Sequence, residues 1–540
     1  MPLTDEKTDA SIIRNNSIYS NIREYLEGSK MKHFVLAMAT SLVALCSANG
    51  LAYAQTAGGI INVATIGEPP TLDPMASTAD LVGIVTQHIF ETLYTFDAKW
   101  GTTPLLAAAM PTISEDGMTY TIPLRTGIKF HDDSVMTSAD VVASLDRWMK
   151  ISTRGKQAAE VITGVVATDA STVTITLSKP YAPLLPLLSF NNAAAIIIPA
   201  ANTTQDPLTS FVGTGPYKLQ ERVPDQYIQL VRFDGYQSLG GEIDGYGGAR
   251  NQYLDEIRFV PVPDPNTRIG AAMAGQYDYV DQLPVEAFKQ ISDGATEPVV
   301  LAPFGWPVFM MNTKEGLNSD IRIRKAIQAA LAPEDMMLAA FGSEDFFSID
   351  AAWYPEGYVW HSEVGTEAYK PQGDTEAAKA LLAEAGYDGK PLRILTSRQY
   401  EFHYKMALVA QAYLEAAGFK VQLDVVEWAT LTTNRADPSQ WDIYITHSPF
   451  LPEPSLMGIM SDTSPGWWVS DAKHAVVEAF NAESDPAKRA ELFVDVQKVI
   501  YDEIPGYKVG NFNALAAQNP DLDGVTPAPW PYFWNAYLSK

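Results

Sequence analysis

The sequence has almost no cysteine, because Cys46 is the only one among its 540 residues. Cys46 lies in an apolar run near the N-terminus, so the long remainder of the chain carries no thiol. The absence of a thiol in that remainder excludes disulfide bonds and thiolate chemistry there. A chain of this length without disulfides must be held together by its hydrophobic core, and its length and 46% apolar content predict two or three lobes.

Positive charge is also scarce. The 38 Lys and Arg residues face 64 Asp and Glu residues, which leaves a formal net charge of -26 and an isoelectric point near 4.6. Such a chain repels nucleic acid and anionic membrane surfaces, so we expect no nucleic-acid partner. The simplest role of the acidity is to keep the protein soluble.

Motifs for catalysis and metal binding are missing. The seven histidines form no HExxH motif, and the sequence has no GxSxG motif, phosphate loop or dinucleotide-binding glycine pattern. His131 beside Asp132 and Asp133 comes nearest to a metal site, but a surface charge pairing is the favoured explanation. We therefore predict a protein that is not an enzyme and that holds no cofactor and no metal.

Long hydrophobic runs are confined to residues 31–55, "MKHFVLAMATSLVALCSANGLAYAQ". Lys32 supplies a basic start, Phe34 to Cys46 is uncharged and apolar, and the Ala-Tyr-Ala sequence that ends at Ala54 fits a cleavage site. This pattern predicts a cleavable signal peptide over residues 31–54 and a periplasmic mature protein. The apolar run is too short for a comfortable membrane span.

The position of this segment also bears on where translation starts. Met31 stands directly before the basic start, and signal peptides begin at the N-terminus, so residues 1–30 are predicted to be an untranslated extension. A lipoprotein signal needs a small residue before its cysteine, whereas Leu45 precedes Cys46. Cleavage without lipidation is therefore favoured.

The rest of the chain mixes strands and helices without flexible linkers. In the first half, apolar spacing predicts a helix over 81–96 and one over 137–149 with Ser138 as its N-cap, and alternation predicts a strand over 119–130. In the second half, helices and strands follow one another over 375–387, 392–397, 403–419, 420–428 and 440–446. Such a succession is typical of an α/β sheet, in which ligands gather beyond the carboxyl ends of the strands.

Several motifs occur in a telling order: "PPTLDP" (69–74), "IFETLYTFD" (89–97), "LRTGIKFHDDSVMTSADVVASLDR" (124–147), "GTGPYKL" (213–219), "IRIRKAIQAAL" (321–331), "AKALLAEAGY" (378–387) and "YLEAAGFKVQL" (413–423). Each is weak alone. Together they resemble the extracytoplasmic solute-binding proteins of peptide ABC transporters, solute-binding protein family 5. The resemblance covers essentially the whole chain after the signal segment.

The resemblance implies an α/β fold of the two-lobed periplasmic binding protein type, class II, with an extra domain on lobe one and the ligand in the cleft between the lobes. On that pattern lobe I comprises residues 55–95, 213–303 and 509–540. The extra domain comprises 96–212 and lobe II comprises 304–508. The lobes close over the ligand about a hinge.

Candidate ligand-binding residues follow the strand ends of the second half. Arg398 and Tyr400 come directly after one strand, and an arginine fork suits the carboxylate of a peptide C-terminus. Trp428 ends the next strand, and Trp306 stands near a predicted lobe crossing. Aromatic walls suit varied side chains because their apolar area is unselective. A surface position for Arg398 and a core position for either tryptophan are the alternatives.

The loop after "WDIYIT" (441–446) departs from the peptide-binding relatives. Those relatives carry a loop aspartate here that pairs with the ammonium group of the ligand, whereas this sequence reads "THSPFLPEPS". His447 and Phe450 are expected to face the ligand from this loop. Glu453 or Glu68 is a candidate substitute for the missing aspartate. Otherwise the ligand lacks a free ammonium group.

The resemblance predicts a periplasmic protein that captures peptides or peptide-like solutes and delivers them to an inner-membrane ABC permease with its ATPase subunits. We expect a monomer. The alternatives are capture of a nickel chelate, an oligosaccharide or an opine-like solute by the same fold, a sensory or chaperone role, and a secreted hydrolase.

Overall fold

The computed structural model describes residues 57–398 and 400–539, all within the unit Thr56–Lys540. The predicted signal peptide at 31–54 and the predicted extension at 1–30 lie outside the described residues. Among the described residues, no helix has the length and apolar character that a membrane crossing requires.

The first lobe is built on one half of a 12-stranded sheet. β1 (Ile60–Thr65) lies parallel to both β12 (Glu256–Pro261) and β13 (Tyr279–Leu283), and helix α7 (Pro265–Met273) connects β12 to β13. The hairpin of β8 (Tyr217–Val223) and β9 (Tyr227–Arg232) continues this half antiparallel to β12. Because β1 and β13 run parallel, their carboxyl ends share one edge of the sheet.

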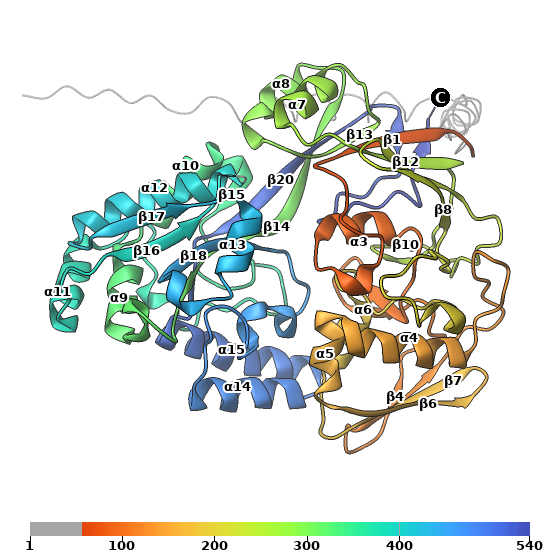
Figure 1. Ribbon diagram of the computed structural model, residues 1–540, viewed down its shortest axis with the longest axis horizontal. Coiled ribbons are helices and arrows are strands. Elements are labelled where there is room, and N and C mark those ends of the chain that lie inside the picture. Colours follow the sequence, from red (N-terminus) through yellow and green to blue (C-terminus); the bar gives the residue numbers. More distant parts are fainter. Residues whose placement is uncertain (1–56, 399, 540) are drawn as a thin grey trace, which may run out of the picture. The chain divides into compact units, whose positions relative to one another are not determined.

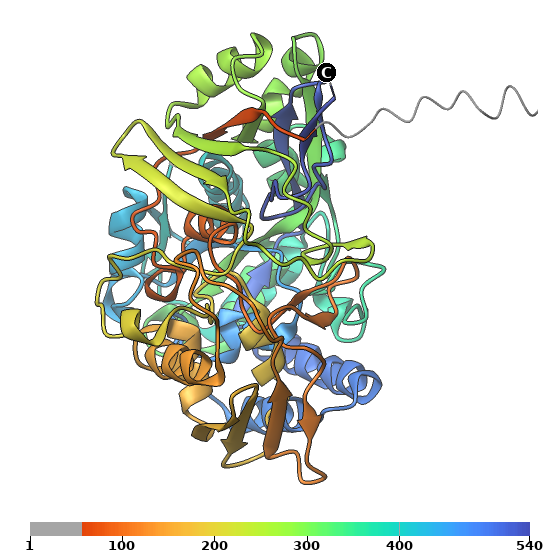
Figure 2. The same cartoon turned by 90° about the vertical axis from the view of Figure 1, so that its right-hand side faces the viewer.

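An additional four-stranded sheet follows the start of the first lobe, in the order β4-β5-β7-β6. Its members, with the helices beside it, are β4 (Thr112–Ile113), β5 (Thr119–Pro123), β6 (Ile162–Asp169), β7 (Thr172–Leu177), α4 (Ser138–Ile151) and α5 (Thr153–Ala159). Figure 2 shows this sheet at the foot of the view with the orange helices next to it. A separate small sheet at this position is what an extra domain requires.

The second lobe carries the other half of the large sheet. Parallel strands β16 (Leu392–Thr396), β17 (Val421–Val425) and β18 (Ile443–Pro449) alternate with α11 (Thr375–Ala385) and α12 (Glu401–Ala416). The predicted helix–strand succession is therefore confirmed. The left-handed conformation of Gly386, at φ 71°, ends α11, as its position in the sequence predicts.

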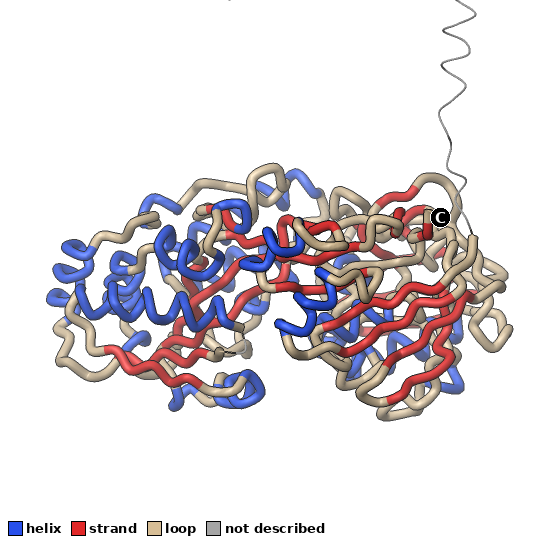
Figure 3. The backbone as a smooth tube through the Cα atoms, turned by 90° about the horizontal axis from the view of Figure 1, so that it is seen from above, coloured by secondary structure: helices blue, strands red, loops and turns tan. Residues whose placement is uncertain are grey.

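Two long strands join the lobes. β14 (Glu297–Met311) pairs with β18 on one side and with β20 (Asn511–Gln518) on the other, and β20 continues to β13 of the first lobe. Figure 1 shows both strands at the centre, and Figure 3 shows the sheet in red passing between the lobes. The register shifts between Leu301 and Gly305, where a Cβ on Gly305 would stand 2.1 Å from the Ser448 carbonyl oxygen.

The remaining elements are short or cover the sheets. They are β2 (Tyr94–Phe96), β3 (Thr102–Pro104), β10 (Ile243–Asp244), β11 (Gly247–Gly248), β15 (Phe347–Ser348), β19 (Gly506–Lys508), β21 (Leu522–Asp523), β22 (Tyr537–Leu538), α3 (Asp80–Thr86), α6 (Leu184–Ser189), α8 (Phe288–Ser292), α9 (Ile321–Ala330), α10 (Pro333–Phe341), α13 (Trp428–Asn434), α14 (Asp471–Ala482) and α15 (Pro486–Glu503). Helix α10 begins at Pro333, where the preceding helix α9 has ended.

Five local predictions were wrong. The strand expected over 420–428 ends at Val425, and Trp428 begins α13. The helix expected over 81–96 ends at Thr86, because 94–96 pairs as β2. The strand expected over 119–130 ends at Pro123, and beyond it Leu124 and Lys129 form isolated bridges. Thr137, which shares a capping box with Asp140, is the N-cap of α4 in place of Ser138. The segment after Thr446 does not leave the strand, since β18 pairs with β14 as far as Pro449.

Candidate functional site

An aromatic cluster gathers at the carboxyl ends of the second-lobe strands. Tyr400 follows β16, Trp428 begins α13 just after β17, and His447 lies near the end of β18. The Tyr400 ring lies 4.8 Å from both the Trp428 and the His447 ring centroids, and Phe402 and His403 of α12 complete the group. These five residues are called the aromatic cluster below. Parallel strands bring their carboxyl ends to one edge, which is why segments far apart in the chain meet here.

The two histidines of the cluster form a buried pair. His447 Nδ1 lies 3.0 Å from His403 Nε2, so one neutral ring donates to the other. Burial lowers the pKa of His447 to about 4 and lowers that of His403 well below its ordinary value. Both rings are therefore uncharged at neutral pH. The described residues contain no group of three or more His, Cys, Asp or Glu side chains that could hold a metal ion.

Phe450 of the second lobe makes ring contacts with the first lobe. Its fully buried ring lies 4.8 Å from that of Trp100, which belongs to the β2–β3 turn, and 4.9 Å from that of Tyr358. Trp100 in turn lies 6.2 Å from Trp530 of the C-terminal segment. The predicted position of Phe450 at the junction between the lobes agrees with these contacts, although its role toward a ligand stays a prediction.

A polar group on the first lobe surrounds Asp80, the first residue of α3. The Oδ1 atom of Asp80 accepts hydrogen bonds from Trp530 Nε1 at 3.0 Å and from Asn192 Nδ2 at 3.2 Å. The backbone oxygen of Asn192 accepts from Arg154 Nε at 3.0 Å, and the Arg154 guanidinium lies 4.5 Å above the Phe190 ring. Burial raises the pKa of the Asp80 carboxyl and lowers that of Arg154 to about 10.

The polar group and the aromatic cluster face each other across the two lobes. Burial raises the pKa of the Tyr400 hydroxyl, and the nearby negative charge of Asp80 raises it further. Direct bonds also join the lobes. The Ala182 backbone N–H donates to the Asn481 carbonyl at 2.8 Å, and Lys405 forms an ion pair with Glu286 at 2.7 Å. The aromatic cluster is called the aromatic wall below, and Asp80, Arg154, Asn192 and Trp530 are called the charged wall.

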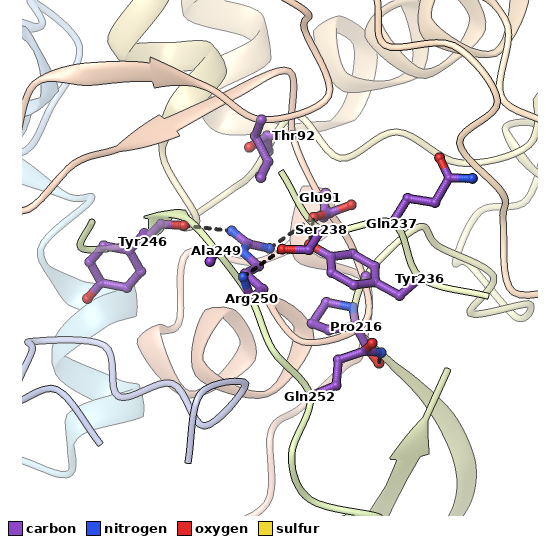
Figure 4. Close-up of polar contacts among 12 residues, drawn as sticks. Glu91, Thr92, Pro216, Tyr236, Gln237, Ser238, Tyr246, Ala249, Arg250 and Gln252 are labelled. Atoms are coloured by element: carbon purple, nitrogen blue, oxygen red, sulfur yellow. Dashed lines mark hydrogen bonds and ion pairs between the residues drawn. The ribbon is translucent and has the colours of Figure 1, made fainter. Parts of the chain in front are cut away.

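A pocket in the first lobe lies behind the charged wall and is lined by Gln87, Phe190, Asn191, Trp530 and Arg250 among others. Figure 4 shows how its floor is held. Arg250 Nη1 donates to Glu91 at 3.1 Å, and Nη2 donates to a backbone carbonyl at 2.8 Å. These partners hold the buried Arg250 guanidinium in place, so the part of the pocket lining near Trp530 is fixed.

The structure places two of the predicted residues away from the aromatic cluster. Arg398 is exposed, donates to the Tyr404 hydroxyl at 2.7 Å and stacks on that ring at 4.1 Å. Glu68 pairs with Arg222 at 2.5 Å and accepts from the Asp225 N–H, which lowers the pKa of its carboxyl. Glu68 has its charge paired, whereas Arg398 has no ion-pair partner among the described residues, and the ligand roles of both stay predictions.

Two further candidates prove to be core residues. Trp306 on β14 is 2% exposed and packs 5.8 Å from the Tyr354 ring. Glu453 is 5% exposed, forms a buried ion pair with Arg489 at 2.5 Å and accepts from the Ser455 N–H as the N-cap of a short 3-10 helix. Glu453 therefore does not replace the missing aspartate, because its partner is supplied by α15.

We expect Glu453→Gln to leave solute affinity within about twofold while it lowers the free energy of unfolding by about 2 kcal/mol, since a hydrogen bond to a charged partner is lost. The measurements are calorimetric titration and urea unfolding. Glu478→Gln, at an exposed ion pair with Lys179, is the control and changes neither quantity. Loss of affinity at unchanged stability would restore Glu453 as an anchor.

Sequence reasoning missed the charged wall entirely. Its members come from four segments: Asp80 from α3, Arg154 from α5, Asn192 from the loop after α6, and Trp530 from the C-terminal segment. None of them belongs to a motif. A weak signal for Asp80 is its place at the start of an apolar helical pattern directly after the "PPTLDP" turn.

Known proteins resemble this chain in sequence and in fold. The family described as "Bacterial extracellular solute-binding proteins, family 5 Middle" matches residues 101–466. The chain is 25% identical over 484 residues to the "Probable peptide ABC transporter periplasmic-binding protein y4tO" of Sinorhizobium fredii, covering 86% of this chain and 90% of that protein.

Two solved structures share the fold. DppA from Helicobacter pylori, in complex with peptide STSA, has a TM-score of 0.76 at 22% identity over 90% of this chain and 99% of its own. AgaA from A. tumefaciens, in complex with agropinic acid, has a TM-score of 0.75 at 26% identity over 89% of this chain and 99% of its own. These likenesses extend across both lobes.

Proposed function

The chain belongs to the bacterial extracellular solute-binding proteins of family 5, and from this we propose that it is the periplasmic substrate-binding component of an ABC importer. It captures a peptide or peptide-like solute and delivers it to an inner-membrane permease with its ATPase subunits. The predicted signal segment at 31–54 supports a periplasmic location. The protein acts as a monomer and makes or breaks no bond.

The two walls are the observation that supports this proposal, and we propose that the ligand-binding cleft lies between them. The aromatic wall belongs to the second lobe and the charged wall to the first, and in the described part of the chain strands β14 and β20 join the two halves of the large sheet. A ligand that contacts both walls stabilises the closed arrangement, whereas water fills the open one. The boundaries that the family resemblance implies for the lobes and the extra domain are part of this proposal.

Tyr400, Trp428 and His447 are proposed as the second-lobe ligand contacts. Their rings supply apolar area that tolerates different side chains, and the buried neutral histidines add hydrogen-bonding atoms without charge. Phe450 is proposed to support the same wall through its contact with Trp100. Such a wall fits peptides, whose side chains vary while their main chain stays constant.

An opine-like solute is the second candidate. AgaA, solved in complex with agropinic acid, is the structure above with 26% identity, and the cleft of this chain lacks the loop aspartate of peptide binders. An opine-like solute joins an amino acid to another polar carbon skeleton, so it also presents charged and apolar parts to the two walls.

Identification of the native solute tests the proposal. The mature protein is purified without refolding and denatured, and the released small molecules are identified by mass spectrometry. Calorimetric titration with a panel of di- and tripeptides, opines, sugars and nickel chelates then gives affinities. A peptide or peptide-like solute is expected. Turnover of a substrate, or binding of a sugar or metal chelate alone, would contradict the proposal.

Trp428→Ala is expected to weaken binding of the identified solute by about thirtyfold, because the cluster loses its largest apolar surface. Calorimetric titration measures the loss. Trp467→Ala is the matched control: Trp467 lies on the same lobe but stacks on Trp441, outside the aromatic cluster. Equal affinities of the parent and Trp428→Ala would remove Trp428 from the site.

A further inference from the structure

Asp80 and Arg154 are two opposite charges of the first lobe that influence each other without being paired. The positive charge of Arg154 lowers the pKa of Asp80, although burial outweighs it. In the described part of the chain no hydrogen bond or ion pair joins the two side chains. Both are half-buried, so each charge has lost much of its hydration.

Each of the two groups has hydrogen-bonding capacity that the protein leaves unused. Asp80 accepts two hydrogen bonds through Oδ1, from Trp530 and Asn192, while no residue in the described ranges donates to its Oδ2. Arg154 donates through Nε to Asn192, while no described residue accepts from its two terminal nitrogens. A partly dehydrated charge with an open hydrogen-bonding position is costly unless another group completes it.

One residue, Asn192, contacts both charged groups. Asn192, which is buried, contacts Asp80 through its side-chain nitrogen at 3.2 Å and Arg154 through its backbone oxygen at 3.0 Å. Its side chain also donates to the Thr78 carbonyl at 2.5 Å, which fixes its orientation. The carboxylate and the guanidinium are therefore both tied to Asn192.

The wall around them is rigid and aromatic. The Phe190 ring supports the Arg154 guanidinium and lies 5.1 Å from the Trp530 ring, whose N–H holds Asp80. The second-lobe side of the cleft, by contrast, offers uncharged histidines and the Tyr400 hydroxyl. Charge recognition is concentrated on the first lobe.

We infer that Asp80 and Arg154 bind the two charges of one free α-amino-acid group in the solute, Asp80 the ammonium and Arg154 the carboxylate. A linear peptide carries these charges at opposite ends. An α-amino-acid group carries them on a single carbon, which matches two anchors that both contact Asn192. The inference rests on the proposed solute-binding function and names its substrate class. It also accounts for the second-lobe loop "THSPFLPEPS", which needs no aspartate if the ammonium group is held on the first lobe.

Four synthetic probes test the inference by calorimetric titration of the mature protein. γ-Glutamyl-alanine has a free ammonium and carboxylate on one carbon, its N-acetyl derivative lacks the ammonium, and its α-amide lacks that carboxylate. Alanyl-alanine has both charges on different residues. We expect γ-glutamyl-alanine to bind, and each blocked derivative and alanyl-alanine to bind about a hundredfold more weakly.

Two variants that remove one charge each assign the anchors. Asp80→Asn weakens γ-glutamyl-alanine about a hundredfold but leaves the N-acetyl derivative unchanged, and Arg154→Gln does the same for the α-amide. Lys156→Gln, an exposed change on the same helix as Arg154, is the control and leaves all affinities unchanged. The comparison of probes on the unaltered protein keeps the test valid if a variant fails to fold.

The outcomes separate two failures. If peptides or other solutes bind while γ-glutamyl-alanine does not, or if the blocked derivatives bind as tightly as the free one, the inference is overturned and the solute-binding function stands. If no solute co-purifies and no member of either panel binds, the proposed function itself fails.

Discussion

Asp73→Ala is expected to lower the free energy of unfolding by about 3 to 5 kcal/mol, because it leaves a buried arginine without its counter-charge. Asp73 is fully buried in the turn after β1, and its carboxylate receives two hydrogen bonds from Arg147 of α4, at 2.5 and 3.2 Å. The pair joins the first-lobe sheet to the helix of the additional small sheet. Urea unfolding monitored by circular dichroism measures the loss.

An exposed ion pair on the same helix provides the matched control. Asp146 and Lys150 lie 2.6 Å apart on α4, and both side chains are more than half exposed. Asp146→Ala should cost at most about 0.5 kcal/mol, because water and salt screen such a pair. Equal losses for the two variants would show that burial does not set the strength of the Asp73 interaction.

Asp281→Asn is expected to stabilise the protein, and the gain should grow with pH. Asp281 on β13 is 2% exposed, and neither of its carboxylate oxygens has a hydrogen-bond partner among the described residues. Burial raises its pKa to about 7 from an ordinary 3.8, although the positive charge of Arg268 opposes the shift. It lies at a register shift of the sheet, next to Gln282 with a φ of 47°.

The direction of the pH effect follows from proton linkage. Below pH 4 both the folded and the unfolded chain hold the proton of Asp281, so that the substitution changes little. Between pH 4 and 7 the folded chain keeps a proton that the unfolded chain releases, so each pH unit costs the parent about 1.4 kcal/mol. Above pH 7 the cost levels off at about 4 kcal/mol, which asparagine avoids because it carries no charge.

Urea unfolding of the parent and of Asp281→Asn at pH 4, 6 and 8 measures this dependence. Asp293→Asn, at an exposed carboxylate at the end of α8, is the control and should show no pH-dependent gain. A gain for Asp281→Asn that is the same at all three pH values would contradict the buried-charge explanation. The strained bulge and the buried carboxyl group both raise the free energy of the folded state. The native Asp281 therefore lowers the stability of the protein.

Much of the second lobe could be predicted from the sequence because its signals are local. The helices over 375–387 and 403–419 have regular apolar spacing and end at glycines, and the strands between them alternate or are continuously apolar. Tyr400, Trp428 and His447, which follow or end different strands in the sequence, lie together in the structure, and their contact with a ligand stays a prediction.

The first lobe resisted the same reasoning where partners are distant. The apolar pattern over 81–96 is compatible with a helix, but pairing with β3 turns its end into a strand. The same limit holds in the second lobe, where Glu453 reads as a loop carboxylate until Arg489 of α15, 36 residues later, is brought against it. Local periodicity carries no information about such a partner.

By itself the sequence determined that the protein is an acidic two-lobed solute-binding protein without disulfides, because composition, periodicity and an ordered set of motifs are properties of the chain alone. Only the tertiary structure decided which charged side chains are paired inside the protein and which keep an open hydrogen-bonding position. Glu68 and Glu453 are neutralised by arginines, whereas Asp80 and Arg154 are held apart by Asn192. That distinction depends on contacts between distant segments, since the cost of a buried charge is set by what surrounds it.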